Sequence, residues 1–460
     1  MDYRYIARIK VEATTPLFVG SGDASLITDS LVIKDHHGLP IIPGTSLAGV
    51  LRHSLENFSD SHIDFNDIFG YQGKDDKGLG SRLVVSSAYL LLNNGKVAEG
   101  ISGYIPNEIV EKFKRLPTRQ HVRINEKGVA DKNCLFDNEV VYAGAQFIFE
   151  VELKGSKADE KSWKEIIKEI KSPTFRIGQG TRNGYGNLKV IEIFEQTYQL
   201  TNEKSFNEYL NFNASFNASL DFEKVDAESL LANYTLEIEP DDFFIFSEGF
   251  GDNQVDNKPI TEEVMVYENN EIKFIEKTLI PASSIKGTIA HRVAFHYNKQ
   301  NKVFADQINT NIADYLNENN PAVARLFGKK GEIKEIDDKK VNIGQRGILL
   351  MDDLYFDDID NSKIFNHVAI DRFTGGGIDG ALFSEKVSYK KDKKITLKIY
   401  LSEKEIDEDI IEALEEALKD ICRGLLPLGG MTTKGFGMFT GKLLKKEEEI
   451  FNYDKQKIEA

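Results

Sequence analysis

Two glycine-rich stretches of the chain carry residue types that could bind a phosphate or a nucleotide base. The first, "GQGTRNGYGNLKV", spans residues 178–190 and presents Arg182, Asn183 and Tyr185. Glycine lets the backbone approach a partner closely or take up a positive φ. One cationic and one aromatic side chain suit a phosphate and a stacked base, respectively. The stretch could also be only the bend of a hairpin, and both interpretations stay open at this point.

The glycine spacing excludes two common nucleotide-binding loops. The order Gly-x-Gly-x-x-x-Gly differs from the dinucleotide fingerprint, and a strand rather than a helix is expected after it. The chain also has no Gly-Lys-Ser/Thr motif, which a Walker loop requires at the start of a helix. What remains is a glycine loop that offers a cation, an amide and an aromatic ring.

A second possible anion site lies at a predicted helix start. In "LPIIPGTSLAGVLRHSLE" (39–56), Thr45 and Ser46 follow a proline and precede an apolar helical pattern, and Arg52 lies farther along. Hydroxyl groups at this place cap backbone N–H groups. The unpaired N–H groups and the positive dipole end of a helix also suit a phosphate. A capped helix without a ligand and a phosphate site are therefore both open interpretations.

Both features occur twice, in the same order. The segment 39–56 returns as "TLIPASSIKGTIAHRVAF" (278–295), which carries Ser283, Ser284, Lys286 and Arg292, and the glycine loop returns as "GGMTTKGFGMFTGKL" (429–443), which carries Lys434 and Phe436. Three further blocks recur between them. A long ordered repeat predicts two homologous tandem domains, covering residues 1–200 and 231–460, with residues 201–230 as a linker or irregular segment.

The elements that must position these residues also repeat. Each half reads as a strand, a short strand, a helix, several further strands, a late helix and a glycine loop that leads into a last strand. This alternation predicts an α+β fold with the helices on one face of the sheet, compatible with a ferredoxin-like domain elaborated by insertions. The charged insertion at residues 328–345 is expected to be a solvated loop.

Composition narrows the function. A chain of 460 residues is too long for one compact core. The net charge of −16 argues against non-specific nucleic-acid binding but leaves room for a local basic groove. The two cysteines are far apart, which argues against a disulfide framework or a zinc ribbon. No apolar run is long enough for a membrane span and no signal core opens the chain, so a cytoplasmic location is expected.

The blocks "IPGTSLAGVLR", "NCLFDNEVVY" and "IDRFTGGGIDGALF", together with the two glycine loops, resemble the RAMP superfamily. The resemblance is greatest to the guide-RNA-binding backbone subunits of type III CRISPR effector complexes, and it covers nearly the whole chain twice. It implies two tandem ferredoxin-like, RNA-recognition-motif-like domains with inserted thumb hairpins. It also places Arg372 and Thr374 in the loop leading into the second thumb, where they are expected to contact RNA with the residues named above.

The same resemblance implies catalysis. Catalytic members of the family carry an Asp in the loop before the "IPG" block, and Asp29 stands at that position. A carboxylate there can hold a divalent cation such as Mg²⁺, which activates water or the 2′-hydroxyl next to the scissile phosphate. In the second repeat, alignment of "TDSLVIKD" with "ITEEVMVYE" puts Glu262 opposite Asp29, and Asp256 lies slightly earlier. Asp29 is thus the expected metal ligand, and Glu262 and Asp256 are the further catalytic candidates.

The leading hypothesis is a double backbone subunit of a type III CRISPR ribonucleoprotein in antiviral defence. It would bind guide RNA, cleave complementary target RNA as a metal-dependent endoribonuclease and contact other effector subunits. The main alternative is a non-catalytic guide-RNA-binding scaffold. A stand-alone guide-processing nuclease would normally need a general-base His; His121 and His367 recur, but no acid or base partner recurs with them. A β-rich protein unrelated to RNA is a fourth hypothesis.

Overall fold

The structure is a computed structural model of the chain. It describes every residue except 26–27, 59–63, 74–77, 101–106, 126–127, 226–231, 248, 309–310, 337–338, 358–361, 390–393, 404 and 460. Among the helices in these described ranges, none combines the length and the apolar character that a membrane span needs.

The first half is built on an antiparallel sheet around β1 (Tyr3–Ala13). This strand pairs with β7 (Gln146–Gly155) on one side and with β8 (Leu188–Gln199) on the other. The remaining strands are β2 (Ile41–Ile42), β3 (Leu83–Val85), β4 (Ala88–Leu90) and β9 (Glu223–Lys224), and the sheet order is β2-β4-β7-β1-β8-β9 with β3 beside β7. The helices of this half are α1 (Gly44–Phe58), α2 (Phe65–Phe69), α3 (Asn107–Lys114) and α4 (Glu160–Ile170).

The second half repeats this strand order. Its central strand β10 (Tyr234–Pro240) pairs with β20 (Ile395–Leu401) and β21 (Phe439–Lys445), both antiparallel. With β16 (Leu349–Met351) and β22 (Glu448–Asn452) at the edges, the order is β16-β20-β10-β21-β22. The order β16-β20-β10-β21 corresponds to β3-β7-β1-β8, because β16 and β3 pair with the equivalent ends of β20 and β7, so the repeat in the sequence is a repeat in sheet topology. The helices are α6 (Ala282–Gln300), α7 (Ala313–Leu316), α8 (Pro321–Phe327), α9 (Glu408–Cys422) and α10 (Tyr453–Glu459).

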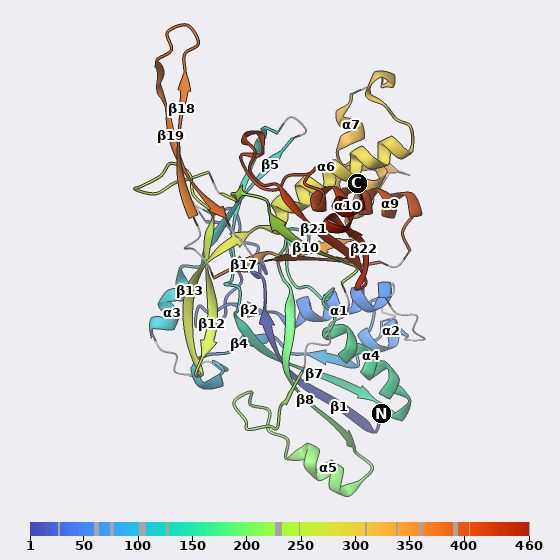
Figure 1. Cartoon of the computed structure of the whole chain (residues 1–460). Helices are drawn as coiled ribbons and strands as arrows, with labels where there is room; N and C mark the ends of the chain where they lie inside the picture. Colours follow the sequence, from blue (N-terminus) through green and yellow to red (C-terminus); the bar gives the residue numbers. More distant parts are fainter. Residues whose placement is uncertain are drawn as a thin grey trace.

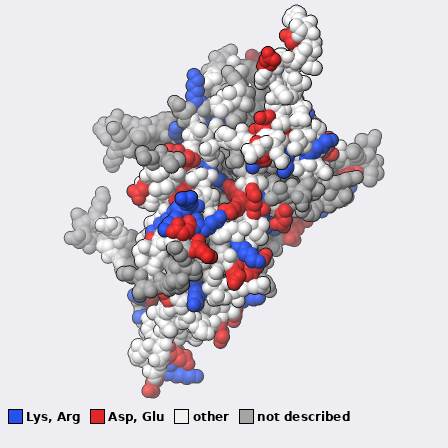
Figure 2. Space-filling model, turned by 90° about the vertical axis from the view of Figure 1, so that its left-hand side faces the viewer, with Lys and Arg blue, Asp and Glu red and all other residues white. Residues whose placement is uncertain are grey.

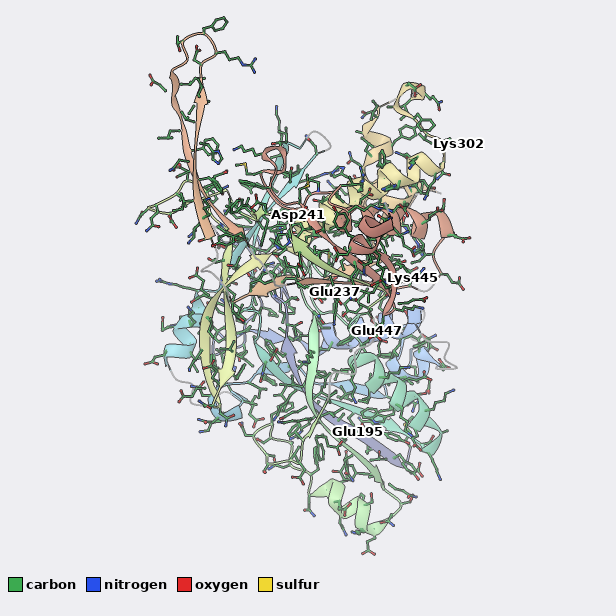
Figure 3. The ribbon with its side chains drawn as sticks, in the orientation of Figure 1. Glu195, Glu237, Asp241, Lys302, Lys445 and Glu447 are labelled. Atoms are coloured by element: carbon green, nitrogen blue, oxygen red, sulfur yellow. The ribbon has the colours of Figure 1, made fainter. Side chains whose placement is uncertain are left out.

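Successive side chains of β1 point to opposite faces of the first sheet, and both faces are covered. Tyr5 and Ile9 are buried in the main core, and the Tyr5 ring lies 5.8 Å from that of Trp163 on α4. Arg8 points to the opposite face, where its guanidinium lies 4.6 Å from the ring centroid of Phe212. Glu195, labelled in Figure 3, accepts a hydrogen bond from Trp163 Nε1 at 2.6 Å and so ties α4 to β8.

Residues 201–230, expected to be a linker or an irregular segment, contain regular structure in their described part. They include α5 (Glu203–Leu210) and β9, and residues 211–225 lie over the outer face of the first sheet. Arg8 donates hydrogen bonds to the carbonyl oxygens of Asn213 and Ser215, both at 2.6 Å. These contacts show that residues 211–225 pack against the first sheet.

Four further hairpins leave the sheets. Two of them, β5 (Thr118–Ile124) with β6 (Ala130–Glu139) and β18 (Ser362–Ile370) with β19 (Gly377–Tyr389), project toward the same end of the molecule (Figure 1). The β18–β19 hairpin joins β11 (Phe243–Phe244) at its root. The charged insertion expected as a solvated loop is instead a hairpin of β14 (Gly328–Ile336) and β15 (Lys339–Arg346). The sequence of the insertion is rich in charged residues, so it shows no apolar alternation of a strand.

The fourth hairpin interlocks the two halves. Strands β12 (Thr261–Glu268) and β13 (Glu271–Ile280) pair with each other, and β13 also pairs with β17 (Leu354–Phe356). Although it belongs to the second repeat, this arm adds Met265 to the core of the first half. Met265 N donates to the Ala143 carbonyl at 2.8 Å, and the Tyr267 hydroxyl donates to the Leu91 carbonyl at 2.8 Å. The halves are thus joined by backbone hydrogen bonds as well as by side-chain packing.

Candidate nucleic-acid interface

The first glycine loop lies at the junction between the two halves. Arg182 Nε donates to the carbonyl oxygen of Gly347 at 2.5 Å, and Asn187 Nδ2 donates to Asp352 Oδ2 at 3.0 Å. A Cβ on Gly184, which has φ +99°, would collide with Ala282 and Asp353 at the start of α6. The glycine is required here because of its positive φ and because side chains of the second half, rather than a phosphate, approach it closely. Asn183 closes a turn inside the loop, with its N–H bonded to the Gly180 carbonyl at 2.7 Å.

Several cations meet beside this loop. Burial, together with a smaller effect of the Arg182 charge, lowers the pKa of Lys286 on α6 to about 8. Burial also lowers the pKa of Arg182, with smaller contributions from Arg346 and Arg176 that outweigh the opposing effect of Glu403. Of these cations, Arg176 has a close counter-ion, since its Nη1 lies 2.6 Å from Asp352 Oδ1. A phosphate would relieve the mutual repulsion of the others, so the junction has the electrostatics of an anion site.

The N-termini of α1 and α6 differ in the groups that contact their backbone N–H groups. At α6, Asp353 Oδ1 accepts a hydrogen bond from Ala282 N at 2.8 Å, so a protein carboxylate already occupies part of this N-terminus. Ser283 is half-buried and Ser284 is exposed. At α1, Thr45 is exposed and Ser46 half-buried, and the N–H of Gly44 bonds Ser87 Oγ at 3.3 Å. The hydroxyls in first turns of both helices therefore reach solvent at least in part.

The two helix arginines expected to contact RNA are engaged within the protein. Arg52 bonds Glu56 and the Gly70 carbonyl, both at 2.9 Å, and so joins α1 to the end of α2. Arg292 bonds Asp420 on α9 at 2.6 Å. Both hold helices together in this structure, which accounts for their presence without a ligand.

In both halves the aromatic residue of the glycine loop packs against the root of a projecting hairpin. Tyr185 is buried, and its hydroxyl lies 2.6 Å from His121 Nε2 on β5. Phe436 is half-buried, 5.8 Å from the Phe365 ring on β18. The buried Tyr185 ring supports the loop and offers no face to a base. Lys434 is exposed, with its Nζ 4.2 Å from the Phe383 ring centroid.

The loop containing Arg372 and Thr374 forms the tip of the β18–β19 hairpin. Asp371 Oδ1 accepts hydrogen bonds from the N–H of Phe373 and of Thr374, at 2.9 and 2.7 Å, and these bonds lower the pKa of Asp371. Phe373 is 99% exposed and Arg372 is also exposed. The tip thus presents a ring and a cation to solvent on a turn held by its own Asp.

Asp29 lies in an exposed loop against the returning strand of the first projecting hairpin. Its N–H donates to Asp137 Oδ1 at 2.8 Å, and its Oδ2 accepts from the N–H of Asp137 at 3.0 Å. Ser30 forms a parallel bridge to Asn138 next to this pair. Two carboxylates are thus fixed side by side near the root of the hairpin.

Asp256 occupies the same place in the second half. Its Oδ2 accepts hydrogen bonds from the N–H and the hydroxyl of Ser384, at 2.7 and 3.0 Å. Asn257 forms a parallel bridge to Glu385, as Ser30 does to Asn138. The structural counterpart of Asp29 is therefore Asp256 rather than Glu262, and Ser384 stands where the first half has Asp137. The sequence alignment put Glu262 opposite Asp29 because the β12–β13 arm lies between the loop of Asp256 and the following helix α6. The loops that contain Asp29 and Asp256 are called the acid loops below.

Glu262 is instead part of an ion network that the sequence did not reveal. Both of its carboxylate oxygens bond Arg119 on β5, and Oε2 also accepts from the Tyr355 hydroxyl at 2.9 Å. Arg119 reaches the fully buried Asp353 as well, with Nη1 2.5 Å from Oδ2. Burial raises the pKa of Asp353 to about 6, and the charge of Arg119 opposes this rise. Such a network joins residues remote in sequence, and no local pattern marks it.

Charge on the surface is mixed. On the face shown in Figure 2, basic and acidic side chains are interspersed over the residues drawn in colour. Within the described ranges, no group of three or more His, Cys, Asp and Glu side chains is arranged to hold a metal. The paired acids at Asp29 and Asp137 are below that number.

Comparison with known proteins agrees with this geometry. The chain matches the RAMP superfamily over residues 10–189 and 273–440, one region in each half. It is also similar to the CRISPR system Cms endoribonuclease Csm3 of Methanocaldococcus jannaschii, with 27% identity over 204 residues that cover 40% of this chain and 77% of that protein. The two matched regions together span most of the chain, one in each of the two halves that share the strand order. The protein therefore belongs to the RAMP superfamily.

Proposed function

We propose that the protein is a double backbone subunit of a type III CRISPR ribonucleoprotein, which binds guide RNA and cleaves complementary target RNA. The observation that carries this proposal is the equivalent placement of Asp29 and Asp256, each in a loop against the root of a projecting hairpin. The similarity to a Csm3 endoribonuclease supports it. Each half would be a ferredoxin-like domain, as its central strand order and antiparallel pairing favour, and the two projecting hairpins would be its thumbs.

Guide binding would use the junction between the halves. The half-buried cations Lys286 and Arg182, whose pKa values are lowered, favour a phosphate as their missing counter-charge. Lys434 and the hydroxyls of Thr45, Ser46, Ser283 and Ser284 would extend the track to solvent-exposed parts of both halves. Arg372 and Thr374 at the second hairpin tip would contact the paired RNA strands.

Cleavage would be centred on the two acid loops. Asp29 is exposed and keeps one carboxylate oxygen outside its bonds with Asp137, which in turn offers its second oxygen. This donor set fits Mg²⁺, which is commonly held by one or two carboxylates together with waters and phosphate oxygens. When bound, Mg²⁺ would supply stabilisation of the charge that develops on the scissile phosphate. Asp137 and Ser384 hold the acid loops in place from the hairpin side.

The test is target cleavage by the assembled complex in Mg²⁺. If both acid loops are catalytic, Asp29→Asn should abolish one set of cuts and Asp256→Asn another, while the double variant should bind target without cutting it. Asp23→Asn, a change of an exposed acid in the same loop as Asp29, serves as the matched control and should cut normally. An unchanged cleavage pattern in the double variant would sink the catalytic proposal and leave a guide-binding scaffold.

A further inference from the structure

Four buried polar atoms at the root of the β18–β19 hairpin make no hydrogen bond in the described structure. They are both carboxylate oxygens of Glu385, the Nε2 of His367 and the Oδ1 of Asn257. The Glu385 side chain is 0% exposed, and that of His367 is 27% exposed. Leaving such atoms unpaired costs free energy, most of all for an ionised carboxylate. An unpaired group of this size points to a missing partner.

The four atoms belong to three neighbouring segments. Glu385 lies opposite Phe365, and His367 lies opposite Phe383, so Glu385 and His367 are diagonal neighbours on one face of the hairpin. Asn257 is the parallel-bridge partner of Glu385, from the acid loop. His367 Nε2 lies 3.1 Å from Glu385 Oε2, although the two make no hydrogen bond. The strand, the returning strand and the loop of Asp256 therefore each contribute one of these residues, and the three are neighbours at the root of the hairpin.

No lysine or arginine among the described residues forms an ion pair with Glu385. Lys434, the cation beside the neighbouring ring, lies with its Nζ 4.2 Å from the Phe383 centroid. Lys363 lies with its Nζ 5.0 Å from the Phe365 centroid. Both cations are thus placed over aromatic rings, which leaves the imidazole of His367, charged only when protonated, as the one group at ion-pair distance from Glu385 within the described ranges.

The first half lacks this arrangement at the equivalent positions. There the hairpin pairs Arg119 with Asn138 and His121 with Phe136, in the register of Phe365 with Glu385 and His367 with Phe383. The neutral Asn138 replaces the carboxylate. The Nε2 of His121 is already taken by the Tyr185 hydroxyl at 2.6 Å. Only the second of these two hairpins therefore gathers an imidazole, a carboxylate and an amide oxygen without partners.

We propose that these three side chains bind a divalent transition-metal cation, of the Mn²⁺ to Zn²⁺ series. Imidazole nitrogen favours such ions over Mg²⁺ and Ca²⁺, which prefer oxygen alone. With metal–nitrogen and metal–oxygen bonds of about 2.0–2.2 Å, the 3.1 Å between Nε2 and Oε2 corresponds to two ligands at roughly a right angle about one ion. The ion neutralises Glu385 and fastens the acid loop to both strands of the hairpin. This site is separate from the carboxylate of Asp256 and does not depend on the proposed RNA cleavage.

The experiment measures bound metal and thermal stability of the purified full-length chain. The protein is stripped with a chelator, mixed with Zn²⁺ or Mn²⁺ separately, freed of excess ion and analysed by mass spectrometry of the metal. Wild-type chain should retain one ion and show a rise in Tm on loading. Glu385→Gln and His367→Gln should each lower the affinity at least tenfold and lose the metal-dependent rise in Tm, with unchanged circular dichroism of the metal-free protein.

Two control variants identify the site. Asp256→Asn removes the acid-loop carboxylate, and His37→Gln removes a histidine of the first half; both should retain the ion as wild type does. Absence of a stoichiometric ion in the wild type, or its undiminished retention by Glu385→Gln and His367→Gln, would overturn the proposal. So would a Glu385→Gln variant that is more stable than the metal-loaded wild type, because Glu385 would then be an unpaired carboxylate and not a ligand.

Discussion

Arg119 is the single side chain that makes the most charged contacts between the two halves. It bonds both oxygens of Glu262 and the fully buried Asp353. Arg119→Met should lower the free energy of unfolding by about 3–5 kcal/mol, because it leaves buried carboxylates without a counter-charge. Chemical denaturation at neutral pH measures this loss. Lys164→Met, which breaks the exposed pair with Glu160, is the control and should unfold like the wild type; an equal loss in both variants would refute the role of Arg119.

A buried carboxyl on α4 should make stability depend on pH. Burial raises the pKa of Glu169 to about 7, and a hydrogen bond with Ser54 offsets part of that rise. Between its ordinary pKa and 7, the folded state holds a proton that the unfolded state has released, so stability falls as pH rises through this window. Glu169→Gln removes this loss, which is at most about 3 kcal/mol.

Thermal unfolding of this variant at pH 5 and pH 8 checks the sign. The gain in Tm of Glu169→Gln over the wild type should be larger at pH 8 than at pH 5. Glu203→Gln, on the exposed surface of α5, should show no such difference. An equal gain at both pH values would mean that Glu169 is ionised in the folded protein over the whole range.

Local sequence patterns name candidate residues but do not place their side chains, and the catalytic and RNA-binding roles of these candidates stay predictions. The family resemblance points to Asp29, in the loop before the "IPG" block, and to Glu262 or Asp256 in the second half. Which of Glu262 and Asp256 is the structural counterpart of Asp29 depends on the hydrogen bonds of Asp256 to Ser384, which is remote in the sequence. The Arg119 network was missed, since its partners are far apart in the sequence and ion pairs leave no periodic pattern.

Among the elements, repeated blocks were the most informative part of the sequence. Their order predicted α+β halves, and the structure shows mixed helices and antiparallel sheets with the same central strand order in each half. Hairpins were harder to predict. The β14–β15 insertion was taken for a loop because its charges mask the alternation, and the β12–β13 arm packs on the other half, a contact that periodicity does not encode.

The β12–β13 arm offers a test of the contact between elements. Gly144, which has φ +85°, lies so close to the arm that a Cβ would overlap the Met265 carbonyl. Gly144→Ala should therefore displace the arm. Gly38→Ala is a matched control with φ +82° and nothing within 4 Å of its Cβ, so it costs only the backbone strain of about 1–2 kcal/mol.

Comparing the two variants separates the backbone strain of alanine at a positive φ from the steric overlap of its Cβ with the arm. The loss of unfolding free energy in Gly144→Ala should exceed that of Gly38→Ala by about 1–3 kcal/mol, the usual cost of overpacking. Denaturant titration gives both values. Hydrogen exchange should also show faster exchange of the Met265 amide in Gly144→Ala alone. Equal losses in the two variants would show that the arm yields without cost.

For the molecule as a whole, the junction of the halves combines a structural and a proposed binding role. The first glycine loop docks on the second half through Arg182 and Asn187, while Lys286 from α6 faces the same place. Because both halves belong to one polypeptide, the first half can supply Arg182 and the second half Lys286 to the same site. RNA affinity and the association of the halves should consequently depend on some of the same residues.

The pKa of Lys286 allows the binding role of this junction to be tested by pH. Without a ligand, the lysine loses its proton near pH 8, whereas a bound phosphate favours the charged form. Affinity for a guide RNA should therefore fall by up to about tenfold between pH 7 and pH 9, as measured by fluorescence anisotropy of a labelled guide at constant salt. Lys286→Arg keeps the charge and should flatten this profile, while Lys434→Arg, at an exposed position, should follow the wild type. A wild-type profile that is already flat, or a slope that persists in Lys286→Arg, would place the guide phosphates away from the junction.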